Sequence, residues 1–264
     1  MKHQNQCPWL PLLAVDPLGL DLRSTAESVK PLGYGGLAVG MGHPQFQNKD
    51  FGSTARRHFR HLLARLGLTL GVLRVGAGIA GAFNSATASK LLDDALAACN
   101  LAHSLQTPLI SVYIGEPADD TTVTGDVIEI CRTLAVRADR TGVVAALSCG
   151  RTAWLLKLLS DLDTPSLAAN LDSVRIISAS GSPPEAAAML AGRMALWTCA
   201  DAIRSGSALQ ITPLGSGQAD GQQVLNILKD QDYTGPIIID VRNLPQPLLA
   251  AAYSFTQLQR WMHA

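Results

Sequence analysis

The fold of this 264-residue chain is decided by residues Thr212–Val241, which read TPLGSGQADGQQVLNILKDQDYTGPIIIDV. A glycine-rich turn is followed by an amphipathic helix that carries Val224 and Leu228 on one side. A Tyr-Thr-Gly-Pro turn then leads into the apolar run Ile237–Ile239, which ends in an acid, Asp240. This order of loop, helix, turn and buried strand forms one αβ unit. Asp240 is thereby placed at the C-terminal end of a strand, where parallel barrels carry functional groups.

Apolar, strand-like runs alternate with helical patterns along the whole chain. The predicted strands cover residues 12–15, 37–40, 69–75, 109–114, 143–147, 167–171, 195–198 and 237–239. The predicted helices cover residues 23–32, 53–66, 86–106, 123–141, 151–162, 183–190, 220–231 and 247–262. Strict alternation implies parallel strands, so the sequence predicts an α/β protein, a single-domain (β/α)8 TIM barrel. The domain covers residues 1–264, with residues 1–10 as a short irregular extension. The alternative is an open doubly wound sheet, which is disfavoured because no GxGxxG follows the first strand.

Composition and charge limit the partners and the compartment. Apolar residues make up 47% and charged residues 16% of the chain, which suits buried parallel strands. With 21 basic and 21 acidic residues the net charge is zero, so we expect no nucleic-acid or membrane partner. A surface with few charges favours self-association into a homo-oligomer. The chain has five cysteines and no CxxC motif, and neither a signal peptide nor a long apolar span is recognised. These features predict a cytoplasmic protein with reduced thiols.

The C-terminal stretch resembles the end of the xylose-isomerase-like TIM barrels, the sugar phosphate isomerase/epimerase superfamily. Members typically read Pro-Leu-Gly-x-Gly-x-x-Asp, a helix, Gly-Tyr-x-Gly, an apolar strand and then a metal-binding Glu. In this chain the final acid is Asp240 instead. Further segments similar to the family are Leu32–Gly40, Ala95–Glu116, Ala168–Ile177 and Met194–Asp201, so the likeness covers nearly the whole chain.

The resemblance implies a degenerate metal site. Family members hold one divalent metal with two Glu, one Asp and one His at the ends of strands five to eight. The corresponding residues here are Ser148, Asp172, Thr198 and Asp240, and Arg175 stands where a nearby family His is expected. Hydroxyl groups are poor ligands for a transition metal, and an arginine adds a fixed positive charge. We therefore expect no cofactor and no family-type metal site. The alternative is a weak divalent-metal site that recruits Glu116, Asp172 and Asp240.

Two further residues near predicted strand ends are open to more than one interpretation. Arg74 interrupts an apolar strand and needs a carboxylate partner. It either forms an internal salt bridge to Glu116 or to an aspartate, or it anchors a carboxylate or phosphate of a ligand. His43 follows the second strand, where it either acts as a general base or bonds to local backbone.

The resemblance implies a sugar isomerase/epimerase-like protein that acts on a small sugar-like or hydroxy-carbonyl compound at the barrel mouth. The candidates for proton transfer are Glu116, Asp172 and Asp240. The candidates for ligand binding are Arg74, Arg175, His43, Ser148 and Thr198. The alternative function is that of a catalytically inactive barrel that binds a ligand or a protein partner.

Overall fold

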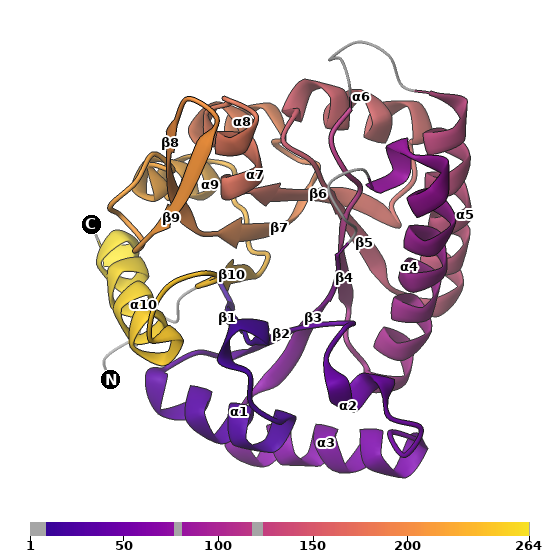
Figure 1. Cartoon of the computed structure of the whole chain (residues 1–264), viewed down its shortest axis with the longest axis vertical. Coiled ribbons are helices and arrows are strands. Elements are labelled where there is room, and N and C mark those ends of the chain that lie inside the picture. The colour runs from indigo at the N-terminus through magenta and orange to yellow at the C-terminus, as the bar shows by residue number, and fades with distance from the viewer. Residues whose placement is uncertain (1–8, 77–80, 118–123, 264) are drawn as a thin grey trace.

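Eight parallel strands close into a barrel that helices surround (Figure 1). The computed structural model describes residues 9–76, 81–117 and 124–263. The barrel strands are β1 (Pro11–Ala14), β2 (Gly36–Gly40), β3 (Thr69–Val75), β4 (Leu109–Tyr113), β5 (Val144–Ser148), β6 (Leu167–Asp172), β7 (Met194–Cys199) and β10 (Ile237–Ile239). The barrel closes where β1 pairs in parallel with β10. The predicted (β/α)8 TIM barrel is confirmed, while most of the extension expected over residues 1–10 lies outside the described residues.

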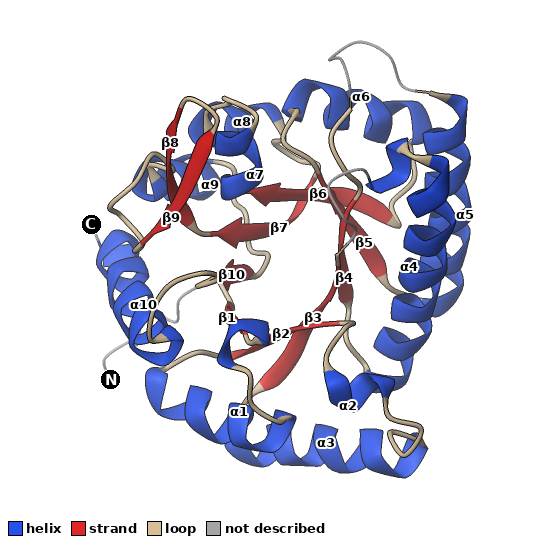
Figure 2. Ribbon diagram, viewed as in Figure 1, coloured by secondary structure: helices blue, strands red, loops and turns tan. Residues whose placement is uncertain are grey.

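The helices form the outer layer, which is blue around the red strands in Figure 2. They are α1 (Leu22–Val29), α2 (Pro44–Gln47), α3 (Ser53–Leu66), α4 (Ser85–Leu105), α5 (Gly125–Thr141), α6 (Thr152–Leu162), α7 (Ser173–Ser178), α8 (Pro183–Met189), α9 (Gly221–Asp230) and α10 (Pro247–His263). The first helix ends sooner than predicted because Pro31 cannot donate a backbone hydrogen bond, and residues Lys30–Leu32 form a 3-10 turn instead. None of the helices in the described ranges is both long and apolar enough to cross a membrane.

Apart from the 3-10 turns at Asp16–Leu18 and Gly81–Phe83, three features were not predicted from the sequence. Two are the short helices α2 and α7, and the third is an antiparallel hairpin of β8 (Asp201–Ser205) and β9 (Ala208–Thr212). The hairpin follows β7 and stands at the outer edge of the barrel, where β8 packs against α7 (Figure 1). Its loop is Gly206-Ser207, with Gly206 in the left-handed region at φ 60°. A Gly-Ser pair between two short alternating runs is a hairpin signal, so this element was readable from the sequence.

The barrel interior is built in layers. Alternate residues of each strand point inward and pack together, and this inner cluster consists of Leu12, Ala14, Ala38, Val72, Leu109, Ala146, Leu196 and Ile238. Three of these side chains are alanine, which leaves room for the larger ones. Gly71 serves the same purpose, because a Cβ there would lie 2.5 Å from a methyl carbon of Leu12. A much larger apolar cluster fills the space between the strands and the helices.

The same alternation places polar side chains above the apolar layer. Arg74 lies two residues beyond the inward-facing Val72 on β3, so its side chain also enters the barrel. Thr198 follows Leu196 on β7, and Asp240 follows Ile238 at the end of β10. Because side chains two residues apart on a strand point to the same side, strands that fill the barrel with apolar side chains end in polar side chains at its mouth.

The glycine-rich turn before α9 is held by a buried acid, Asp201, at the start of β8. The Asp201 carboxylate accepts hydrogen bonds from the backbone N–H groups of Ala202, Gly215, Gly217 and Ala219, at 2.9–3.0 Å. A side chain on Gly217 would clash with this carboxylate and with the Thr212 side chain. The turn that resembles the family motif is therefore shaped by one carboxylate that satisfies four backbone donors.

We expect Asp201→Asn to destabilise the fold, because an amide N–H2 would face backbone donors that the carboxylate now satisfies. The free energy of unfolding should fall by about 2–3 kcal/mol in urea denaturation. The matched control is Asp161→Asn on the exposed face of α6, which should change it by less than about 0.5 kcal/mol. Equal stability of the two variants would contradict this role of Asp201.

Candidate functional site at the barrel mouth

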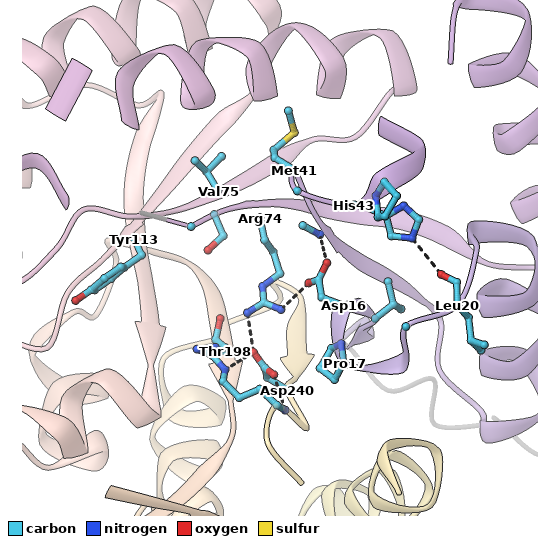
Figure 3. A pocket seen from close by; sticks show the side chains of 18 of the residues that line it. Asp16, Pro17, Leu20, Met41, His43, Arg74, Val75, Tyr113, Thr198 and Asp240 are labelled. Atoms are coloured by element: carbon cyan, nitrogen blue, oxygen red, sulfur yellow. Dashed lines mark hydrogen bonds and ion pairs between the residues drawn. The ribbon is translucent and has the colours of Figure 1, made fainter. Parts of the chain in front are cut away.

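A cavity of about 760 Å³ opens at the C-terminal ends of the strands (Figure 3). Its outer wall comes from the loops after β1 and β2, and its inner wall comes from the ends of β3, β4, β6, β7 and β10. Six of the eight candidate site residues line it, namely His43, Arg74, Asp172, Arg175, Thr198 and Asp240. Glu116 and Ser148 are not among the described residues of the wall.

The centre of the mouth is the Asp240 carboxylate, whose side chain is fully buried. Arg74 donates to its Oδ2 atom through Nη2 at 2.6 Å. Arg242 contacts the same oxygen through Nε at 2.8 Å and through Nη2 at 2.5 Å. Burial alone would raise the pKa of Asp240, but the charges of Arg74 and Arg242 outweigh it and lower the pKa to about 2. Asp240 is therefore a fixed negative charge at any physiological pH.

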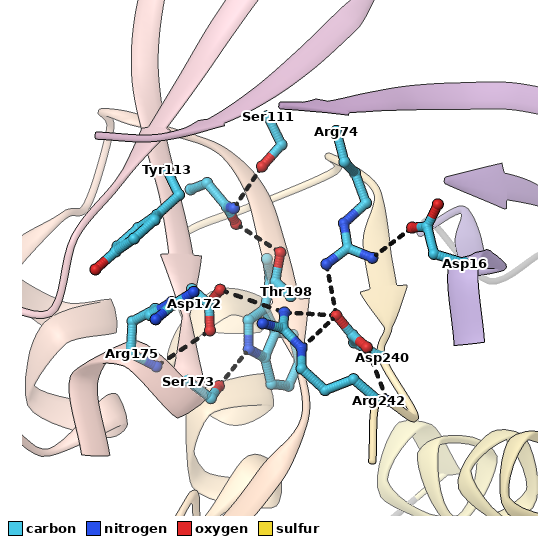
Figure 4. A network of polar contacts seen from close by, with 12 residues as sticks. Asp16, Arg74, Ser111, Tyr113, Asp172, Ser173, Arg175, Thr198, Asp240 and Arg242 are labelled. Carbon is cyan, nitrogen blue, oxygen red and sulfur yellow. Dashed lines mark hydrogen bonds and ion pairs between the residues drawn. The ribbon is translucent and has the colours of Figure 1, made fainter. Parts of the chain in front are cut away.

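The ion pairs continue on both sides of Asp240, as Figure 4 shows. On one side, Nη1 of Arg74 donates to Asp16 at 3.2 Å, and Asp16 also accepts from the backbone N–H of Gly40 at 2.8 Å. On the other side, Nη2 of Arg242 lies 3.7 Å from Oδ2 of Asp172. The result is a chain of alternating charges that runs from β1 through β3 and β10 to β6. The partner expected for Arg74 is found, since Arg74 pairs with the acid of the eighth barrel strand.

Asp172 ends β6 and also begins α7. Its Oδ1 atom accepts from the backbone N–H of Arg175 at 3.2 Å, so the carboxylate is the N-cap of the helix. Its Oδ2 atom is turned towards Arg242. The Asp172 side chain is 7% exposed and lines the cavity, so this carboxylate is oriented by the backbone yet open to a ligand.

The guanidinium group of Arg175 lies over an aromatic ring. Its guanidinium carbon is 3.9 Å from the ring centroid of Tyr113, which extends from the end of β4. Tyr113 in turn donates its hydroxyl to Glu116 at 3.1 Å, and Glu116 accepts from the backbone N–H of Gly150 at 2.8–2.9 Å. Burial raises the pKa of Glu116 against these hydrogen bonds. Glu116 therefore supports Tyr113 from behind and does not face the cavity.

The remaining candidates have local roles. Nδ1 of His43 accepts from the backbone N–H of Gln45 and Nε2 lies 3.2 Å from the Leu20 carbonyl, so the ring binds local backbone (Figure 3). Thr198 donates to Asn170, and Asn170 donates to Ser111, both at 3.0 Å, which forms a polar floor. Ser148 is buried, with 1% of its surface exposed.

Three groups at the mouth were not identified from the sequence, namely Arg242, Tyr113 and Asn170. Arg242 lies two residues after Asp240. Residues two apart on an extended chain point to the same side, so a search that continued two residues past the strand-end acid would have identified Arg242.

The residues at the mouth do not fit the divalent metal that the resemblance implies. Of the four corresponding positions only Asp172 and Asp240 carry carboxylates, and guanidinium nitrogen atoms already contact the Oδ2 atom of Asp240. Thr198 donates its hydroxyl hydrogen to Asn170. In the described part of the chain, no group of three or more His, Cys, Asp and Glu side chains could hold a metal ion, and this includes the set Glu116, Asp172 and Asp240.

The ion pairs of Asp240 with Arg74 and Arg242 predict how the stability of the fold depends on pH. Because the pKa lies below its ordinary value of 3.8, the unfolded chain binds this proton more readily between about pH 4 and pH 2. The stabilisation by Asp240 is present above this window and is lost as the pH falls through it. Asp240→Asn should lower the free energy of unfolding at neutral pH by about 3 kcal/mol, and should remove this part of the pH dependence.

The control for this measurement is Asp163→Asn, because Asp163 forms an exposed ion pair with Arg193 and has a side chain that is 81% exposed. Its loss should cost less than about 1 kcal/mol. An Asp240→Asn variant that unfolds along the same stability-versus-pH curve as the parent would refute the buried charge pair.

Comparisons with known proteins agree on the fold. A family model described as a xylose isomerase-like TIM barrel matches residues 26–262. No curated protein matches the sequence. Among solved structures, a xylose isomerase domain protein from Planctomyces limnophilus is similar, with a TM-score of 0.80, 20% identity and coverage of 96% of both chains.

Two further similar structures are complexes. A xylose isomerase-like TIM barrel protein from Mycobacterium smegmatis in complex with magnesium has a TM-score of 0.73 and 17% identity, over 99% of this chain and 98% of that one. D-Psicose 3-epimerase with D-tagatose from Clostridium cellulolyticum H10 has a TM-score of 0.73 and 14% identity, over 96% and 98%. Identities this low show a shared fold alone. The family match, which spans most of the chain, shows that this protein belongs to the xylose isomerase-like TIM barrel family.

Proposed function

We propose that this protein is a sugar isomerase/epimerase-like enzyme that moves a proton on a small sugar-like or hydroxy-carbonyl compound without a metal ion. The observation that carries the proposal is the position of the Asp172 carboxylate, on the cavity wall beside the guanidinium group of Arg242. A base next to fixed positive charge is what the removal of a proton beside a carbonyl group requires. Membership of the xylose isomerase-like family, whose fold a D-psicose 3-epimerase shares, supports the reaction class.

The three candidate acids have different surroundings, which suggests different roles. Asp240, with a pKa of about 2, is too weak a base, and we assign it to holding Arg74 and Arg242 in place. Glu116 lies behind Tyr113, and we assign it to positioning that ring and the Arg175 stacked on it. Asp172 remains as the group that exchanges a proton with the ligand.

In the proposed step, Asp172 takes a proton from the carbon next to the ligand carbonyl. The electron pair of the broken C–H bond forms a carbon–carbon double bond, and the carbonyl electrons move to oxygen, where they give an enediolate. Donors from Arg74 and Arg242 stabilise this negative oxygen without having to reorganise. For the isomer, Asp172 returns the proton to the former carbonyl carbon while the hydroxyl proton of the adjacent carbon passes to the enediolate oxygen, so that the carbonyl re-forms one carbon along. For the epimer, a water on the opposite face gives a proton to the original carbon as the carbonyl re-forms, and Asp172 passes its own proton through solvent to the hydroxide that remains.

Arg175 offers a second contact for the ligand. It lines the cavity, and in the described ranges no carboxylate lies within ion-pair distance of its guanidinium group. We assign it to an anionic or strongly polar end of the compound, which a planar guanidinium binds through paired hydrogen bonds. Thr198 and His43 also line the cavity, and we assign them to its shape and polarity.

We further propose a cytoplasmic location and a homo-oligomer. The four described cysteines are buried thiols, which supports a reducing compartment. Leu249 and Tyr253 lie four residues apart on α10 and are 65% and 47% exposed, which supports self-association through this helix. The ligand is expected to be a small molecule at the mouth, and the neutral net charge gives no support for nucleic acid.

The test is incorporation of solvent deuterium into a panel of ketoses and aldoses in ²H₂O, followed by NMR. The parent should exchange the hydrogen next to the carbonyl of at least one compound, and Asp172→Asn should lower that rate by about 10²–10⁴-fold. Asp161→Asn, an exposed acid on α6, serves as the matched control with an unchanged rate.

Full exchange by Asp172→Asn would contradict the assignment of the base. Binding of a panel compound without any exchange by the parent would favour the alternative, a barrel that binds its ligand but does not convert it.

A further inference from the structure

Two guanidinium groups converge on one carboxylate oxygen at the barrel mouth. Arg74 arrives from β3 and Arg242 from the loop after β10, and their nearest nitrogen atoms lie 2.6 and 2.5 Å from Oδ2 of Asp240. Both side chains line the cavity and are only 20% and 26% exposed. Ion pairs with so little exposure are weakly screened by solvent, so their attraction is stronger than that of surface pairs.

The position of one atom, Nη2 of Arg242, is decisive. It lies 2.5 Å from Oδ2 of Asp240 and 3.7 Å from Oδ2 of Asp172, and so it stands between the two carboxylates. The hydroxyl of Thr198 belongs to the same region, because Thr198 pairs in register with Asp172 on one side and with Ile238 on the other. A cation that bridged Asp172 and Asp240 would have to occupy the space that this nitrogen fills.

The charge of the two arginines also equals that of a divalent metal ion. An arginine remains protonated at any pH that the folded protein tolerates, so Arg74 and Arg242 together supply two fixed positive charges. A divalent cation would supply the same charge to the same carboxylates. Unlike a metal ion, the guanidinium groups also retain N–H groups for other acceptors. Nη1 of Arg242 and Nε of Arg74 have no acceptor in the described ranges of the chain.

We propose that Arg74 and Arg242 form a built-in dication that takes the place of a divalent metal ion, and that Arg242 blocks the position from which a metal ion could bridge Asp172 and Asp240. In this arrangement the cations neutralise Asp172 and Asp240, and their remaining N–H groups bind a negatively polarised oxygen of the ligand. Only the second part rests on the proposed function. The exclusion of metal follows from the geometry alone.

The direct test is to remove Arg242 and ask whether the site gains a metal. Arg242→Gln leaves Asp240 paired with Arg74 but opens the space between Asp172 and Asp240. Titration with Mn²⁺ alone, followed by electron paramagnetic resonance, should show binding to this variant at least about tenfold tighter than to the parent, which corresponds to about 1.4 kcal/mol. Arg242→Lys, which keeps a positive charge at this position, should show no such gain.

A second substitution locates the gained site. Arg242→Gln combined with Asp172→Asn should lose the gain, because one of the two bridging carboxylates is gone. If Arg242→Gln is unstable, Mn²⁺ should raise its melting temperature and leave that of the parent unchanged, since an ion that binds only the folded state stabilises it.

Three results would overturn the proposal: Mn²⁺ binding by the parent as tight as by Arg242→Gln, no gain in binding and no thermal stabilisation of that variant, or a gain that persists without Asp172. Deuterium exchange by the parent is measured without added Mn²⁺, so proton transfer by Asp172 can be observed when this inference fails, and the inference can hold when no exchange is observed.

Discussion

A carboxylate that the last strand carries into the barrel, beyond the reach of water, must be neutralised where it lies. In this protein that carboxylate is Asp240, whose side chain has no exposed surface. The need of this carboxylate for positive charge explains why Arg74 interrupts the apolar strand β3 and why the chain after β10 turns Arg242 back onto the strand end. Each arginine then needs a further acceptor at its outer edge, which Asp16 and Asp172 supply. One buried charge thus orders side chains from four strand ends.

The chain satisfies its two central buried acids in different ways, with different consequences. Asp201 accepts four backbone N–H groups and shapes the glycine-rich turn, which leaves nothing for a ligand. Asp240 is satisfied by two arginines that line the cavity, and each of them has an N–H group without an acceptor in the described ranges. Donors held in place before a ligand arrives cost no reorganisation when charge develops on it. The structural network and the proposed chemistry therefore share the same arginines.

The barrel strands were predictable because buried parallel strands read as unbroken apolar runs, and Arg74 was conspicuous as a charge within such a run. Arg242 offers no such contrast, since a charged residue in a loop is ordinary, and its spacing of two residues from Asp240 is the one sequence signal for the contact between them. Glu116 was assigned to the mouth from its place after β4, but packing puts Tyr113 in front of it. Which side chain covers another is decided by tertiary contacts that strand position does not encode.

The central claim is that a guanidinium group stands between Asp172 and Asp240 in place of a metal ion. Anomalous diffraction from crystals of the parent protein soaked in MnCl₂ tests this claim most directly. The account predicts no anomalous peak between the two carboxylates, with the guanidinium group of Arg242 in contact with Asp240 as described. A manganese peak at that point, with Arg242 displaced from Asp240, would contradict it.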